Sequence, residues 1–176
     1  DEEAATVLRE EQTRRVGWLQ RVPIFKPVTS KSVFMEELAR RLEVRTIRKG
    51  EMLIQKGDVT GTEMYFIARG AAEVLNSLEQ PAFIKLREGD FCGEGALLED
   101  APRNAFVRVQ TDTAKLYVLD RENLQQVLRS YPDADKVIRA PLEQRRLARE
   151  KVVREMQQAE QEERKRKKRE KQRQAR

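Results

Sequence analysis

Between residues 44 and 119, short runs of alternating apolar and polar residues recur at intervals of about ten residues, separated by turns that contain glycine. A period of two favours β-strands, and many short strands in succession are typical of an antiparallel sandwich or barrel. We therefore expect an antiparallel, jelly-roll-like β-roll of about eight strands. Its recognisable strands are predicted at Val44–Arg48, Met52–Gln55, Met64–Arg69, Ala72–Leu75, Ala82–Leu86, Ala105–Gln110 and Lys115–Leu119.

Helical patterns precede this β-region. Apolar residues scattered among charges indicate a helix over residues 1–22, which Pro23 interrupts. Ser32 is then expected to cap an amphipathic helix that ends near Arg41, because its hydroxyl can accept a hydrogen bond from the first helical turn. The predicted fold class is thus α+β, with N-terminal helices flanking the roll.

Helical patterns return after the last strand. Asp120 is expected to cap a first helix, and Asp133 is expected to cap a second one that runs from about Ala134. We expect Pro141 to kink or split this second helix, since proline lacks a backbone donor and clashes with the preceding turn. From Leu142 onward there is no glycine or proline, so a long charged C-terminal helix is predicted.

The charge of the chain is concentrated near its C-terminal end. From Glu143 onward there are 14 Lys and Arg against 7 Asp and Glu, whereas the formal charge of the whole chain is +6. The remainder is therefore close to neutral, and the asymmetry indicates an appendage with its own partner. We accordingly predict a helical linker at 1–22, a globular domain at 23–150 and a basic helical extension at 151–176.

The basic extension offers cations but little apolar surface. Opposite charges three and four residues apart within 162–167 can stabilise a solvent-exposed single helix, and the apolar seam of a coiled coil is missing there. The cluster Arg164–Lys171 could attract an acidic protein or an anionic membrane surface. The alternative is a solvated charged helix without a partner.

Several function classes are disfavoured by what the sequence lacks. It has no histidine and a single cysteine, Cys92, which can form neither an intrachain disulfide nor a zinc site. No nucleophile–base constellation is evident, so neither catalytic nor metal-binding residues are expected. No apolar run is long enough to span a membrane and no signal-peptide pattern opens the chain, which favours a cytoplasmic location. DNA binding is not expected, because no helix-turn-helix follows the roll.

The loop from Phe91 to Asn104 departs from strand patterning and carries the candidate site. Gly93, Gly95 and Ala96 are small, so backbone N–H groups there can approach a phosphate closely. A single helical turn just after them would place a partial positive charge at the same point. These features are those of an anion-binding loop.

Two charged residues refine this interpretation. Arg103 has a planar guanidinium that can hold a phosphate with two hydrogen bonds. Glu94 would repel a phosphate, unless its carboxylate accepts hydrogen bonds from sugar hydroxyls. The combination indicates a sugar phosphate rather than a bare anion. Taken alone, the pair could also be a strand-surface arginine and a solvated loop carboxylate.

The phosphate-binding cassette of cyclic-nucleotide-binding domains is similar to this loop, in which Gly89-Asp90-Phe91-Cys92-Gly93-Glu94-Gly95-Ala96-Leu97-Leu98 is followed by Pro102-Arg103-Asn104-Ala105. The likeness extends backward through Lys49-Gly50-Glu51, Lys56-Gly57-Asp58 and residues 63–70, and forward through the last strand and helices. It covers about residues 22–150 and implies a β-roll with a helix packed behind the pocket.

The resemblance implies a role for each matching residue. Arg103 would pair with the cyclic phosphate, Glu94 would accept from the ribose 2′-hydroxyl, and Gly93 and Ala96 would offer backbone donors. Apolar side chains of the roll would line the purine pocket, although they would be buried in any case. The remaining candidate ligand-binding residues of the roll are Gly95, Leu97, Asn104, Ala105, Val74, Ile84 and Leu86. The implied ligand is cAMP or cGMP, and no further cofactor is implied.

Two residues depart from the family pattern. Cys92 replaces the usual Phe before Gly-Glu, and we interpret it as a small buried hydrophobe rather than a redox switch. Asn104 stands where the family has Thr or Ala beside the arginine. A Thr at this position favours cGMP in channels, so Asn104 leaves the preference between cAMP and cGMP open.

Two flanking segments look like those of cyclic-nucleotide-gated and hyperpolarisation-activated channels, namely Trp18–Phe25 before the roll and Asn123–Ala134 after it. In those channels the last helix presents side chains to the purine, which implies Arg145 and Arg149 as further ligand contacts. The alternative is that both arginines lie on a solvated helix face.

The expected function is that of a regulatory module within a larger parent chain. It would bind a cyclic purine nucleotide and transmit its occupancy through movement of the C-terminal helix. One alternative is a nucleotide-independent scaffold module of a large assembly, for example in a cilium. Another is the regulatory domain of a cyclic-nucleotide-dependent kinase. The module would lie in the cytoplasm, on the cytosolic face of a membrane or in a cilium.

Overall fold

The structure is a computed structural model that describes residues 1–98 and 102–174. Within the candidate loop, Glu99, Asp100 and Ala101 lie outside the described residues, as do residues 175–176 of the predicted extension. The strands are β1 Glu43–Arg48, β2 Met52–Ile54, β3 Glu63–Arg69, β4 Ala72–Leu75, β5 Ile84–Leu86, β6 Phe91–Cys92, β7 Phe106–Val109 and β8 Thr113–Asp120. The helices are α1 Glu2–Arg21, the 3-10 helix η1 Pro23–Val28, α2 Ser32–Arg40, α3 Gly95–Leu98, α4 Arg121–Ser130 and α5 Pro132–Gln174.

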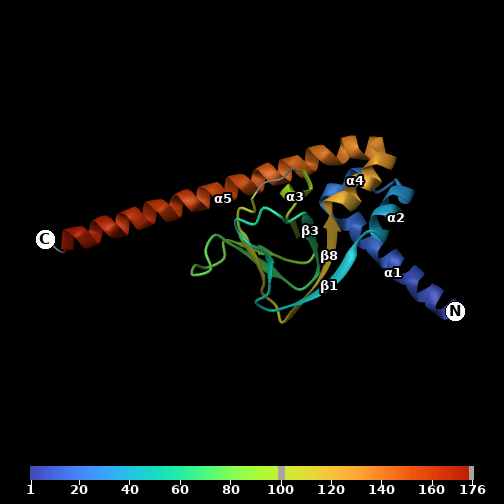
Figure 1. Ribbon diagram of the computed structural model, residues 1–176, viewed down its shortest axis with the longest axis horizontal. Helices are drawn as coiled ribbons and strands as arrows, with labels where there is room; N and C mark the ends of the chain where they lie inside the picture. Colours follow the sequence, from blue (N-terminus) through green and yellow to red (C-terminus); the bar gives the residue numbers. More distant parts are fainter. Residues whose placement is uncertain (99–101, 175–176) are drawn as a thin grey trace.

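The strands form two four-stranded antiparallel sheets, with the orders β1-β8-β3-β6 and β2-β7-β4-β5 (Figure 1). Helices lie before and after the roll, and α5 runs across it and continues well beyond it (Figure 1). The predicted α+β fold, an antiparallel roll with flanking helices and a long C-terminal helix, is therefore confirmed. Among the described residues, no helix is both long and apolar enough to cross a membrane.

The least predictable strand is β6, which sequence patterning placed in the loop. It is two residues long and pairs with β3, with Tyr65 opposite Cys92 and Phe66 opposite Phe91. Two residues are too few for an alternating pattern, so only the partner strand reveals this one. The strand predicted from Ala82 begins two residues later, at Ile84.

The helix caps agree with the sequence at one position and differ at two. The Asp120 carboxylate accepts a hydrogen bond from Glu122 N at 2.8 Å, as predicted for the cap of α4. Ser32 is not a cap but the first residue of α2, because the Lys31 carbonyl accepts from Met35 N at 3.0 Å and already begins the helical bonding.

α5 also begins earlier than predicted, and it is not split. Tyr131 O accepts from Asp135 N at 3.1 Å, so the helix starts at Pro132 and the cap predicted at Asp133 is wrong. Proline suits a first helical position because its missing N–H is not needed there. The helix is continuous through Pro141, and Ile138 and Leu142 on either side of this proline are both buried in the core.

β3 separates two apolar cores because both of its faces are buried. Its Phe66 side chain packs among the helices, where the ring of Trp18 meets it edge-on at 5.5 Å between centroids. Its Tyr65 and Ile67 side chains point into the interior of the roll, between the two sheets. The alternation along one strand thus joins the helical layer to the wall of the candidate site.

Candidate functional site

The candidate loop forms a turn and one helical turn directly after β6. Ala96 N donates to Gly93 O at 3.1 Å and Leu97 N donates to Glu94 O at 3.1 Å, which closes α3. Arg121 of α4 donates to the Ala96 carbonyl and ties α3 to the helical layer. The predicted helical turn is present, although the Ala96 N–H that the resemblance assigns to a ligand is engaged within the turn.

Gly93 is required at the start of this turn. Its φ is +84°, a conformation that other residues rarely adopt. A Cβ atom there would lie 2.9 Å from the Glu63 carbonyl oxygen and 3.0 Å from Nη1 of Arg103. The absence of a side chain therefore lets the loop approach β3 and lets the guanidinium of Arg103 lie against the backbone.

The guanidinium of Arg103 is held by backbone carbonyls. Nη2 donates to Glu63 O at 2.7 Å and Nη1 donates to Gly93 O at 3.3 Å. A Cβ at Gly61 would lie 2.9 Å from both Nε and Nη2, so a second glycine also makes room for this side chain. Arg103 is thus oriented by the chain itself.

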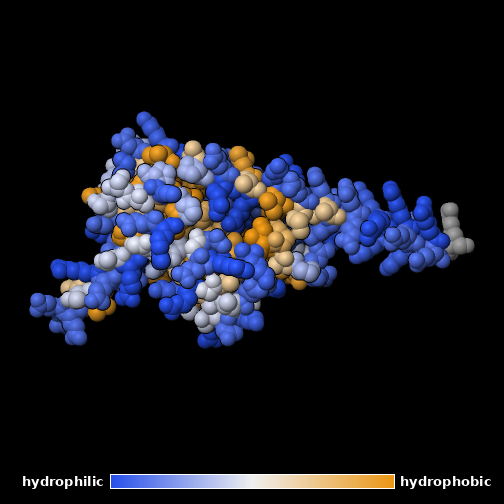
Figure 2. All heavy atoms as spheres, turned by 180° about the vertical axis from the view of Figure 1, so that it is seen from behind, coloured by the Kyte–Doolittle hydropathy of each residue, from blue (hydrophilic) through white to orange (hydrophobic). Residues whose placement is uncertain are grey.

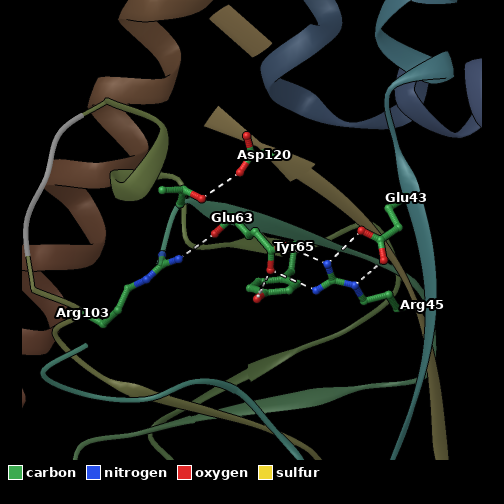
Figure 3. Close-up of polar contacts among 7 residues, drawn as sticks. Glu43, Arg45, Glu63, Tyr65, Arg103 and Asp120 are labelled. Atoms are coloured by element: carbon green, nitrogen blue, oxygen red, sulfur yellow. Dashed lines mark hydrogen bonds and ion pairs between the residues drawn. The ribbon is translucent and has the colours of Figure 1, made fainter. Parts of the chain in front are cut away.

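Glu63 connects Arg103 to a charged network on the neighbouring strands. Its carbonyl faces Arg103, whereas its carboxylate faces Arg45 of β1 (Figure 3). Nη2 of Arg45 lies 2.7 Å from Oε1 of Glu63, and its other partner is Glu43. The hydrogen bonds from Arg45 lower the pKa of the Glu63 carboxyl, while burial and the hydrogen bond to Glu63 raise the pKa of the Tyr65 hydroxyl. The network thus ties the end of β3 that contacts Arg103 to β1.

Glu94 is the buried charge of the loop. Only 3% of the residue is exposed, and its Oε1 has no hydrogen-bond partner among the described residues. Its counter-charge comes from α5, where Nε of Arg149 lies 3.7 Å from that oxygen. Arg149 also donates from Nη2 to Phe91 O at 2.6 Å. A buried carboxylate with an unsatisfied oxygen is suited to accept a hydrogen bond from a ligand.

Glu94 and Arg103 line a common hollow between the loop, the inner faces of β2, β4 and β7, and α5. The lining comprises Ile54, Val74, Cys92, Gly93, Glu94, Gly95, Ala96, Pro102, Arg103, Asn104, Ala105, Val107, Arg146, Arg149 and Glu150. The lining combines apolar side chains of the strands with charged side chains of both signs from the loop and α5. Such a hollow fits a ligand with an apolar ring and an ionic end.

Over residues 44–131 the sequence matches the family described as the cyclic nucleotide-binding domain. The chain belongs to this family. It is 33% identical over 128 residues to a cyclic nucleotide-gated channel of Caenorhabditis elegans, which covers 69% of this chain and 17% of the relative. It is 33% identical over 112 residues to the cAMP-dependent protein kinase regulatory subunit of Yarrowia lipolytica. This match covers 64% of this chain and 29% of the relative. It is also 34% identical over 99 residues to human potassium/sodium hyperpolarization-activated cyclic nucleotide-gated channel 1. That match covers 56% of this chain and 11% of the relative.

The fold of this cyclic nucleotide-binding domain is shared with a solved structure, the regulatory domain of Toxoplasma gondii PKA with cAMP. The TM-score is 0.64 at 23% identity, and the match covers 80% of this chain and 52% of the other. The chain spans only 11% to 29% of the length of the three sequence relatives. The domain itself is a regulatory, non-catalytic module.

The structure brings nine of the predicted site residues of the cyclic nucleotide-binding domain to the hollow, namely Val74, Gly93, Glu94, Gly95, Ala96, Arg103, Asn104, Ala105 and Arg149. Four lie elsewhere. Leu97 packs into the helical core, and Leu86 into the interior of the roll next to the half-buried Ile84. Arg145 lies with its guanidinium carbon 4.8 Å from the centre of the Phe91 ring.

Sequence reasoning did not select six of the lining residues of this domain, namely Ile54, Cys92, Pro102, Val107, Arg146 and Glu150. Val74 was selected through the family resemblance alone. Ile54 and Val107 are also buried strand residues, so strand alternation could have added them as candidates. Nothing local marks Arg146 and Glu150, because their place depends on how α5 packs on the roll. Cys92 is buried, and burial raises the pKa of its thiol to about 12, which agrees with its interpretation as a small apolar side chain.

Proposed function

We propose that this domain binds cAMP or cGMP between the loop and α5, and that α5 transmits the occupancy of the site to a larger signalling protein. The proposal rests on one observation. Arg103 and the buried Glu94 line the same hollow, and Glu94 has an oxygen without a hydrogen-bond partner in the described chain. A cyclic nucleotide supplies a phosphate for the guanidinium and a ribose 2′-hydroxyl for the carboxylate.

Transmission through α5 is supported by the contacts of Arg149. This side chain belongs to α5, pairs with Glu94 and donates to the Phe91 carbonyl, so it touches the loop at two points. A ligand that engages Glu94 therefore changes the environment of α5 directly. It shifts the position of the helix by the difference between its affinities for the two arrangements.

Calorimetric titration of the chain with cAMP and with cGMP tests the proposal, with 5′-AMP as the control that lacks the cyclic phosphate. We expect one site per chain with a dissociation constant on the order of micromolar for a cyclic purine nucleotide. A folded chain that gives neither heat nor a thermal shift with millimolar cAMP or cGMP would refute it. That result would favour the nucleotide-independent scaffold.

The parent protein is proposed to be channel-like, because two of the relatives described above are channels. The regulatory domain of a cyclic-nucleotide-dependent kinase is the second candidate, supported by the Yarrowia regulatory subunit. A location in the cytoplasm, on the cytosolic face of a membrane or in a cilium remains a prediction.

We also propose that the end of α5 binds an acidic protein or an anionic membrane through Arg164–Lys171. Every described side chain from residue 161 to 174 is exposed, and Figure 2 shows this projecting end as hydrophilic. In the described chain, the only ion pairs of this segment join Lys167 to Glu163 and Arg166 to Glu170. The other cations are therefore available to an anionic surface.

A further inference from the structure

A second attachment of α5 lies beyond the candidate site, where one asparagine receives contacts from α5 and from the segment after β2. Asn76 follows β4, and its Nδ2 donates to the Glu160 carboxylate of α5. Gln157 of α5 donates to Oδ1 of Asn76 at 3.1 Å. Lys56, which follows β2, donates to the same oxygen at 2.7 Å and to the Asn76 carbonyl at 3.2 Å. We call the contacts of Asn76 with Gln157 and Glu160 the clasp.

The clasp lies on the side of α5 that faces the roll. Arg149, Val153, Gln157 and Glu160 follow one another at helical spacings of four, four and three residues, so they share one face of α5. Val153 is only 5% exposed. From Arg149 to Glu160 the helix advances by about 16 Å. α5 is thus attached at the loop, at a buried valine and at the clasp.

Asn76 of the clasp directly follows β4, one of the strands that line the same hollow. Asn76 comes two residues after Val74, and Lys56 comes two residues after Ile54, and both of these apolar side chains line the hollow. None of the clasp residues lines it themselves. Their contacts with α5 therefore do not depend directly on what the hollow contains.

From this arrangement we infer that Asn76 is a positioning residue, which holds α5 over the binding loop and thereby slows the release of bound nucleotide. The inference rests on the proposed function. An attachment that favours the closed helix raises the fraction of binding-competent molecules, and so raises the apparent affinity. The same attachment must break before α5 can swing away, so it also slows dissociation.

The size of the effect follows from the exposure of the clasp. Asn76, Gln157 and Glu160 are half-buried, so each hydrogen bond contributes a modest amount. Loss of the two bonds between Asn76 and α5 should speed nucleotide dissociation by roughly 5- to 30-fold. The affinity should fall by a similar or smaller factor.

The experiment compares the whole 176-residue chain with three variants. Asn76→Asp keeps the shape of the side chain but turns the donor that faces Glu160 into a carboxylate. Gln157→Ala with Glu160→Ala removes the partners on α5. Gln158→Ala with Gln161→Ala is the matched control, because these exposed neighbours have no hydrogen bond to the roll among the described contacts.

Two readouts separate this inference from the proposed function. The first is the dissociation rate of a fluorescent cAMP analogue, displaced by excess cAMP in a stopped-flow instrument. The second is amide hydrogen exchange of residues 149–160 without nucleotide, which reports the opening of α5 whether or not the chain binds nucleotide. Both clasp variants should raise both rates, and the control should leave them unchanged.

Wild-type binding combined with unchanged dissociation and exchange in both clasp variants would overturn the clasp and leave the proposed function intact. Failure of the wild type to bind any cyclic nucleotide would refute the proposed function, and the exchange rates would still decide whether the clasp holds α5. Equal acceleration in the control pair would also overturn the inference, because it would show a general loss of helix stability.

Discussion

Replacing Arg103 with alanine should remove most of the affinity for a cyclic nucleotide. In the described chain, two of the five N–H groups of its guanidinium donate to the carbonyls of Glu63 and Gly93. Three donors and the full positive charge therefore remain for a phosphate. Two charge-assisted hydrogen bonds at about 1.5–3 kcal/mol each correspond to roughly a 100- to 10,000-fold loss of affinity.

Glu94→Ala should cost much less, about tenfold. It removes an acceptor for the ribose, but it also removes a buried carboxylate that repels the phosphate. It further leaves Arg149 of α5 without the carboxylate that now lies 3.7 Å away. Arg103→Lys should fall between the two, because a lysine keeps the charge but lacks the planar fork.

The assay is a competition titration of each variant against a fluorescent cyclic nucleotide, with the melting temperature measured in parallel. The melting temperature is needed because Arg103→Ala leaves the Glu63 carbonyl without its 2.7 Å partner. Equal losses of affinity for Arg103→Ala and Glu94→Ala, in variants that remain folded, would refute the roles assigned to these residues.

Three further predictions concern the surroundings of the site. Gly61→Ala should weaken nucleotide binding about tenfold in a competition titration, with little change in melting temperature. The reason is that a Cβ atom at residue 61 would lie 2.9 Å from the guanidinium of Arg103 and would displace that group. Hydrogen bonds from Arg45 lower the pKa of Glu63 below its ordinary 4.5, so this pair contributes stability that is present above pH 4.5 and is lost as the pH falls through the lowered pKa. The melting temperatures of wild type and Glu63→Gln should therefore differ at pH 7, and the difference should shrink as the pH falls below 4.5. Truncation after Glu160 should leave the melting temperature and the nucleotide affinity unchanged while reducing salt-sensitive binding to anionic vesicles. Truncation after Glu150 also removes the buried Val153 and should lower the melting temperature by roughly 3–8 °C. If the chain truncated after Glu160 failed to fold, the charged end of α5 would have to pack on the roll.

The roll was predictable because its pattern is local and repeated. Strand alternation correctly placed residues such as Val74, and the glycine turns separate the strands as expected. The spacing of Glu94 and Arg103 within one loop also indicated an anionic ligand before any fold was known. These features depend only on neighbours along the chain, which the sequence displays directly.

The contacts of α5 could not be predicted in the same way. The predicted domain boundary lies at residue 150, yet contacts between α5 and the roll continue to Glu160 through Val153 and Asn76. A domain that ends at residue 150 remains a prediction. Likewise, Glu63 holds Arg103 through a carbonyl oxygen, and a backbone atom leaves no signature in the sequence. Such contacts arise from the path of the whole chain.

The most direct test of nucleotide binding at this site is a nitrogen-15 NMR titration of the chain with cAMP and with cGMP. The account predicts saturable shifts, at one equivalent for the tighter ligand, of the Gly93 and Gly95 amides, the Arg103 Nε–H group and the α5 amides around Arg149. Absence of shifts at millimolar nucleotide, or shifts confined to the charged end of α5, would contradict it.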